Sequence, residues 1–126
     1  MMAAPNIVGP TTITAKTTYL SSVTGATGTV LLNNATGSNK VLQVQSLYCS
    51  NVDGTNNADV TVKVHSEDDG GGTGRAVCNT VVVPADASVI IVDKTAPLWL
   101  EEDQSIVVTP SASDDLEFVC SYLEIS

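Results

Sequence analysis

Oxygen-bearing side chains gather in one short stretch, "SNVDGTNNADVTVKVH" (residues 50–65), and their spacing resembles a loose calcium loop. Its acidic members, Asp53 and Asp59, are weak candidate metal ligands. An EF-hand loop has twelve residues and ends in a bidentate Glu, which this stretch lacks. Asp53-Gly54 is by itself a tight-turn dipeptide, because Gly accepts a positive φ and Asp bonds its own backbone. The sequence therefore favours a connector over a cation site.

Two other acidic stretches suggest chemistry that their neighbours do not support. In "HSEDDGGGTGR" (65–75) the glycines follow three acids and precede an expected strand, whereas a phosphate cradle needs a Lys or a helix N-terminus. In "LWLEEDQSI" (98–106) adjacent acids point to opposite faces of a strand, whereas a glycosidase needs two acids facing one bond. We expect the first stretch to be a solvated loop whose tip, Asp68 and Asp69, contacts a partner.

The cysteines and the single histidine do not form a recognisable catalytic or metal-binding set. Cys49, Cys78 and Cys120 are odd in number, form no CxxC pair, and each lies in an apolar-rich run. This pattern predicts buried small hydrophobes rather than a disulfide framework. No partner can be inferred for His65, the only His. We therefore expect no enzymatic activity and no cofactor.

The charge balance bears on the kind of partner. The formal net charge is −9, and the five basic residues are scattered singly. Nucleic acids and anionic membranes attract positive surfaces, so neither is an expected partner. The longest apolar runs, such as "VIIV", are far shorter than the ~20 residues that span a bilayer.

Period-two hydrophobicity dominates the chain and predicts the fold. Val60, Val62 and Val64 alternate with polar residues, and turn clusters such as "NNATGSN" and "VPADAS" separate the alternating runs. No segment has the apolar spacing of a helix. The sequence predicts a single all-β domain over residues 11–126, a jelly-roll-like antiparallel β-sandwich of about eight strands with no significant helix. We place strands near residues 11–20, 27–33, 40–50, 58–66, 75–83, 87–93, 97–100, 104–110 and 115–125.

The same periodicity predicts faces and positions within the sheets. Strict alternation in residues 41–50 places Leu42, Val44 and Tyr48 on one face, and Val41, Leu47 and Cys49 on the other. The dense β-branched runs "AVCNTVVV" and "SVIIV" are typical of central strands.

Residues 1–39 are almost without charge, and Lys16 is their only charged residue. Soluble monomers usually guard edge strands with charges, prolines or bulges, so we expect another chain to cover this region in a homo-oligomer. Residues 1–10 read as an extended N-terminal arm that either packs on a neighbouring subunit or frays. The candidate partner contacts here are Pro5, Asn6, Ile7, Val8, Thr12 and Thr14.

Several segments together carry a resemblance: "MAAPNIVGPTTITAKTTYL", "LYCSNVDGTNNADVTV", "VPADASVIIVDKTAPLWLEEDQSI" and "VCSYLEIS". They resemble small virion structural proteins of tailed phages that infect marine cyanobacteria, over nearly the whole chain. The resemblance implies an all-β sandwich that decorates the capsid or sits in the neck or tail, with no catalytic residues. It also implies location in the virion after synthesis in the host cytoplasm, with the major capsid protein as the main partner.

We therefore expect a capsid decoration or cement protein that binds the outer head surface. The alternative is a recognition module at the tail or a vertex. In that case the loops "EDDGGGTG" and "NVDGTNN" would bind a host glycan or surface protein.

Overall fold

The computed structural model describes residues 5, 7–21, 23 and 28–126. These residues form nine strands and no helix, and so include no apolar helix of membrane-spanning length. The strands are β1 (Ile13–Leu20), β2 (Thr29–Asn34), β3 (Val41–Asn51), β4 (Ala58–His65), β5 (Gly74–Val83), β6 (Ser88–Val92), β7 (Leu98–Leu100), β8 (Gln104–Pro110) and β9 (Leu116–Ile125).

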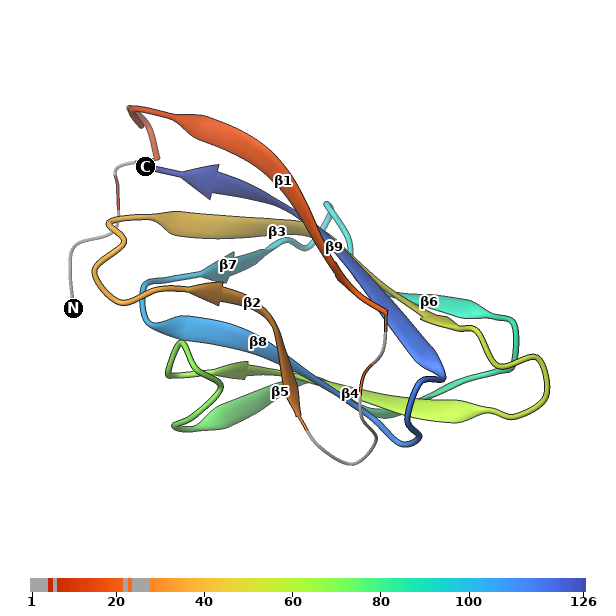
Figure 1. Cartoon of the computed structure of the whole chain (residues 1–126). Helices are drawn as coiled ribbons and strands as arrows, with labels where there is room; N and C mark the ends of the chain where they lie inside the picture. Colours follow the sequence, from red (N-terminus) through yellow and green to blue (C-terminus); the bar gives the residue numbers. More distant parts are fainter. Residues whose placement is uncertain (1–4, 6, 22, 24–27) are drawn as a thin grey trace.

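The strands form two antiparallel sheets packed face to face (Figure 1). The first sheet has the order β1-β9-β3-β6, with short β7 also paired to β3, and the second has the order β2-β8-β4-β5. Two Greek keys wound across two four-stranded sheets make a jelly roll, and β7 is an addition to that plan. The predicted β-sandwich is confirmed, and each predicted strand has its counterpart.

Alternating residues from both sheets fill the core. Val60 and Val62 of β4 are fully buried, and so are Leu116, Phe118 and Cys120 of β9. The predicted inward face of β4 is therefore correct at Val60 and Val62. Removing such side chains from water is the main contribution that holds the two sheets together.

The predicted faces of β3 are wrong for Tyr48. The pairing of β3 with β9 shifts register between Val44 and Ser46, where a β-bulge adds one residue. Beyond the bulge the alternation is inverted, so Leu47 and Cys49 join Val44 in the core. Tyr48 is turned to the outer face, where it is 41% exposed.

The two dense β-branched runs are edge strands, so the prediction that they are central is also wrong. β5 ends the second sheet and β6 ends the first. Their outward residues, including Val82 and Ile90, are exposed. β-Branched composition reports a fit to a pleated surface, and it does not distinguish a central strand from an edge.

Candidate functional site

The calcium-like stretch is the turn between β3 and β4. The Asp53 carboxylate accepts hydrogen bonds from the backbone N–H groups of Thr55 (2.8 Å) and Asn56 (3.3 Å). These bonds favour the ionised form and hold the pKa of the Asp53 carboxyl below its usual range. Asp59 lies on β4, where its backbone N–H donates to Ser111 Oγ at 2.8 Å. Among the described residues no three His, Cys, Asp or Glu side chains gather as metal ligands would.

The acidic loop between β4 and β5 is tied to its surroundings. The Asp68 carboxylate accepts a hydrogen bond from the Thr36 N–H at 3.0 Å, and the Asp68 N–H donates to Asp103 at 3.3 Å. The exposed Asp69 carboxylate accepts from the Gly71 N–H at 2.8 Å. Asp68 therefore fastens the loop to the β2–β3 turn, while Asp69 fixes the conformation of the loop itself.

Glu102, from the acidic run after Trp99, is a structural carboxylate. Its side chain is only 4% exposed. Its two oxygens accept from the backbone N–H groups of Gly37 and Asn39, both at 3.0 Å. Glu102 thus connects the β7–β8 turn to the β2–β3 turn. No local sequence pattern indicates this role, because the partners are backbone groups distant in the chain.

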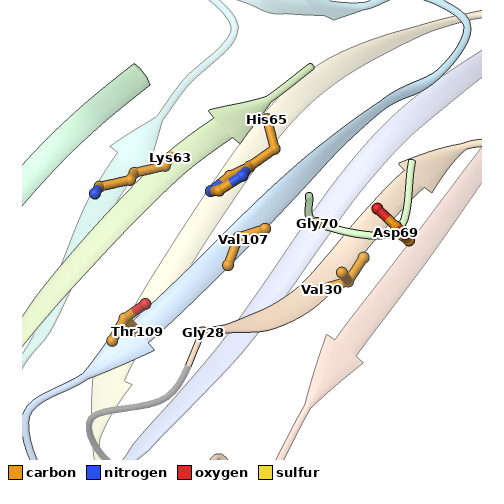
Figure 2. Close-up of a pocket in the computed structure, with 8 residues that line it drawn as sticks. All are labelled: Gly28, Val30, Lys63, His65, Asp69, Gly70, Val107 and Thr109. Atoms are coloured by element: carbon orange, nitrogen blue, oxygen red, sulfur yellow. The ribbon is translucent and has the colours of Figure 1, made fainter. Parts of the chain in front are cut away.

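A depression of about 350 Å³ lies on the outer face of the second sheet (Figure 2). Val30 and Val107 form its apolar part, Lys63 and His65 project from β4, and the β4–β5 loop closes one side. His65 Nδ1 lies 3.2 Å from the Gly71 carbonyl oxygen. The ring is therefore oriented by a loop carbonyl, and not by a hydroxyl or thiol that a histidine base could activate. The depression arises because this loop folds back over the sheet.

The loop can approach the sheet because residue 70 is glycine. A Cβ on Gly70 would lie 3.0 Å from Val30 Cγ2, and the Gly70 φ is +87°. Both the close approach and the left-handed backbone exclude most other residues here.

All three cysteines are free thiols. Burial raises the pKa of Cys49 and of Cys120 to about 12, and it also raises the pKa of Cys78. The thiolate is the reactive form, so these thiols are poor nucleophiles at neutral pH.

The edge strand β1 is the least protected element of the sandwich. Its first five residues, Ile13–Thr17, are exposed. Its ladder with β9 runs over eight consecutive pairs, Ile13–Ile125 to Leu20–Phe118, with no register shift. Among the described residues β1 pairs with no strand except β9. Figure 1 shows it along the open side of the first sheet.

The hydrogen bonds of β1 define which of its backbone groups face outward. Thr12 and Ser126 exchange two backbone hydrogen bonds, the N–H of each donating to the carbonyl of the other at 3.0 Å. In an antiparallel ladder such hydrogen-bonded pairs alternate with non-hydrogen-bonded pairs, whose N–H and C=O groups point away from the partner strand. The even-numbered residues of β1 therefore bond to β9. The backbone groups of Ile13, Ala15, Thr17 and Tyr19 point toward the open edge.

The other edge strands are shorter or irregular. The β2–β8 and β3–β6 ladders each contain a register shift, and the β4–β5 ladder contains two. Thr80 of β5 lies in the left-handed region with a φ of 48°, an unusual conformation for a β-branched residue. Such bulges twist an edge and hinder pairing with another strand.

A row of large apolar side chains crosses the outer face of the first sheet from this edge. Tyr19 is opposite Val119, Val119 is opposite Tyr48, and Tyr48 is opposite Ile90. Directly opposed residues share a face. The four side chains are 71%, 41%, 41% and 58% exposed, respectively. We call this set the apolar row; the sequence missed it because the β3 bulge reverses Tyr48.

The predicted partner contacts fall in part beside this edge. Thr12 and Thr14 are exposed at the start of β1, and Ile7 and Val8 are exposed before it. Pro5 is half-buried, and Asn6 lies outside the described residues. The structure does not bring these residues together with Asp68 and Asp69, whose contacts are with the β2–β3 turn, the β7–β8 turn and their own loop.

No protein-family model and no curated protein matches the sequence. A solved structure is similar in fold: a Bacillus endospore appendage, of a novel family of disulfide-linked pili. The TM-score is 0.55 and the sequence identity 21%, over 100% of this chain and 98% of that one. At this level of identity the similarity shows a shared fold and nothing more.

The match corrects the expected function. We predicted a capsid decoration protein, or else a tail or vertex recognition module, and the similar structure belongs to a different kind of structural protein, a bacterial pilus. The functional prediction is therefore wrong on this finding. The resemblance to cyanophage virion proteins, the location in the virion, the capsid-protein partner and the lack of enzymatic activity stay predictions.

Proposed function

We propose that this chain is a non-enzymatic structural subunit that associates with other copies of itself by strand pairing at β1. The observation that carries the proposal is the long, regular and open edge of β1. An exposed row of backbone donors and acceptors is a template for another strand, and monomeric proteins normally guard it.

The charge that would guard this edge is neutralised within the chain. Lys16 is the only charged residue of β1. Its Nζ lies 3.1 Å from Glu124 Oε2 on β9. An approaching strand therefore meets a paired ammonium group, which repels less than an isolated one.

The apolar row supports an assembly role. It begins at Tyr19 on β1 itself and continues across the sheet to Ile90. Contiguous exposed apolar patches are typical of interaction sites on soluble proteins. Strand pairing at β1 would bring a second copy against the Tyr19 end of the row.

The appendage similarity favours a polymer-forming class, but the cysteines indicate a different linkage. The appendage pili are described as disulfide-linked. Here Cys49 and Cys120 are fully buried and Cys78, on β5, is half-buried, so none of the three thiols is fully exposed. The assembly we propose is held by hydrogen bonds and apolar contacts.

A substitution at Thr17 tests the proposal. The Thr17 N–H faces the open edge, so Thr17→Pro removes an outward donor and no bond to β9. Thr17→Val is the matched control, because both variants lose the Thr17–Ser121 hydroxyl contact (3.1 Å) and only Pro lacks the N–H. We expect light scattering after size exclusion to give a monomer for Thr17→Pro and the wild-type oligomer for Thr17→Val.

Thermal melting accompanies the measurement, to confirm that the Pro variant is folded. A folded Thr17→Pro variant with the oligomer mass of the wild type would contradict the proposal. A wild-type protein that stays monomeric up to high concentration would also contradict it.

A further inference from the structure

We infer that two copies pair β1 against β1, antiparallel and two-fold symmetric, with Thr17 opposite Thr17 of the second copy. This inference rests on the proposed function and specifies its interface. β1 is the partner of choice for β1, because it is the one long edge among the described strands whose ladder has no register shift.

The hydrogen-bond pattern restricts the possible registers. Only the odd-numbered residues of β1 direct backbone groups outward, as the Thr12–Ser126 exchange shows. The new ladder must therefore match odd residues with odd residues. This match also keeps the outer faces of both sheets on the same side, since directly opposed residues share a face. In every two-fold register that matches odd with odd residues, one residue of β1 lies directly opposite the same residue of the second copy. We call this residue the centre of the register.

Two of these registers preserve most of the strand. β1 spans Ile13–Leu20, so centring on Lys16 pairs residues 13–19, and centring on Thr17 pairs residues 14–20. Every other centre pairs fewer residues. The Lys16 centre aligns four pairs of outward-facing odd residues, and the Thr17 centre aligns three. The choice between the two depends on the side chains that come face to face.

Charge decides between the two centres. Centring on Lys16 places two ammonium groups directly opposite each other, in a non-hydrogen-bonded pair with Cα atoms about 4.5 Å apart. Like charges in that position are destabilising. Centring on Thr17 puts Lys16 opposite Thr18 and moves the two lysines to a diagonal separation of about 7–8 Å. Each lysine there keeps its own Glu124 partner.

The Thr17 centre is also compatible with the outer face. It makes a Thr–Thr pair, which is favourable across strands, and it sets Tyr19 opposite the small side chain of Ala15 of the second copy. In each chain Ala15 is opposite Leu123, so the apolar row continues from Tyr19 into the second copy. The first sheets of both copies become one continuous sheet. A symmetric contact of this kind closes on itself, so any larger assembly is built from such pairs through another surface.

Directed disulfide formation between two variants tests the register. In the Thr17-centred pair Thr14 is opposite Leu20, and in the Lys16-centred pair Thr14 is opposite Thr18. Both are non-hydrogen-bonded pairs, whose Cα separation of about 4.5 Å lies within the disulfide range. A Thr14→Cys copy is therefore mixed with a Leu20→Cys copy, and separately with a Thr18→Cys copy. All copies carry Cys78→Ser, which removes the most accessible native thiol.

One copy in each mixture carries a mass tag, so that the mixed product is resolved on a non-reducing gel. We expect the Thr14–Leu20 product and little Thr14–Thr18 product. A dominant Thr14–Thr18 product would overturn the Thr17 register. The absence of both products, with a wild-type protein that still associates, would overturn the β1–β1 interface but leave the proposed function in place. A wild-type protein that does not associate would overturn both.

Discussion

Val62 and Thr61 are neighbours on β4 with opposite environments. Val62 is 0% exposed between the sheets. Thr61 is on the outer face, where its Oγ1 accepts a hydrogen bond from the Thr80 N–H at 3.0 Å. Alternation in the sequence was enough to assign both faces, because β4 has one side in the core and one side outside.

A matched pair of aspartates tests this assignment. We expect Val62→Asp to prevent soluble folding, because the carboxylate would be buried without a partner. We expect Thr61→Asp to change the free energy of unfolding by less than about 1 kcal/mol, since a carboxylate oxygen can still accept from Thr80. Soluble yield and urea unfolding measure the two effects. Equal damage from both substitutions would show that the register of β4 is wrong.

Residue-level prediction failed where a contact depends on distant partners. The prediction for Tyr48 is wrong because a bulge between Val44 and Ser46 reverses the faces of the residues that follow it. This bulge depends on the pairing of β3 with β9, and the local sequence does not encode that pairing. The role of Glu102 was missed for the same reason, since it binds the backbone of another turn. Asp53 was predictable because an Asx turn needs only its own neighbours.

At the scale of elements, the ion pairs of Glu124 join β1 and β3 to β9. Glu124 accepts from Lys40 Nζ at 2.9 Å and from Lys16 Nζ at 3.1 Å. The hydrogen bond from Lys40 is the main reason why the pKa of the Glu124 carboxyl is lowered from 4.5. A carboxyl with a lowered pKa stabilises the fold above its unfolded-state pKa, and the contribution is lost as the pH falls through the folded-state pKa.

Glu124→Gln tests this contribution. We expect it to lower the free energy of unfolding by about 0.5 kcal/mol at pH 7, a small effect because Lys16 is 45% exposed and water screens the pair. At pH 3 the difference between variant and wild type should shrink, because the wild-type carboxyl takes up its proton below pH 4.5. Urea unfolding at both pH values provides the measurement. An undiminished difference at pH 3 would mean that packing, not charge, makes Glu124 important.

The positions of the strands could be predicted from the sequence, but their order within the sheets could not. Gly, Asn, Asp and Pro clusters fix where the chain turns, and these are local properties. Edge or central position depends on which strands meet across the fold. The runs that form β5 and β6 therefore looked central although both are edges. The low charge of β1 was the one sequence signal for an open edge, and the structure places β1 at an edge.

At the scale of the whole molecule, an open edge and an apolar row occur on a strongly acidic chain. A net charge of −9 makes two copies repel each other at long range. At physiological ionic strength the Debye length is about 8 Å, so this repulsion is largely screened while contacts at the edge are not. Association through β1 is therefore to be measured near 0.15 M salt.

Backbone amide hydrogen exchange along β1, followed by NMR as a function of protein concentration, detects strand pairing between two copies residue by residue. In the dilute protein the amides of Lys16 and Thr18, which bond to β9, should be protected, and those of Ala15, Thr17 and Tyr19 should exchange quickly. As the concentration rises, the amides of Ala15, Thr17 and Tyr19 should become protected as well. If these three amides exchange equally fast at every concentration, β1 does not pair with another copy, and the account is wrong.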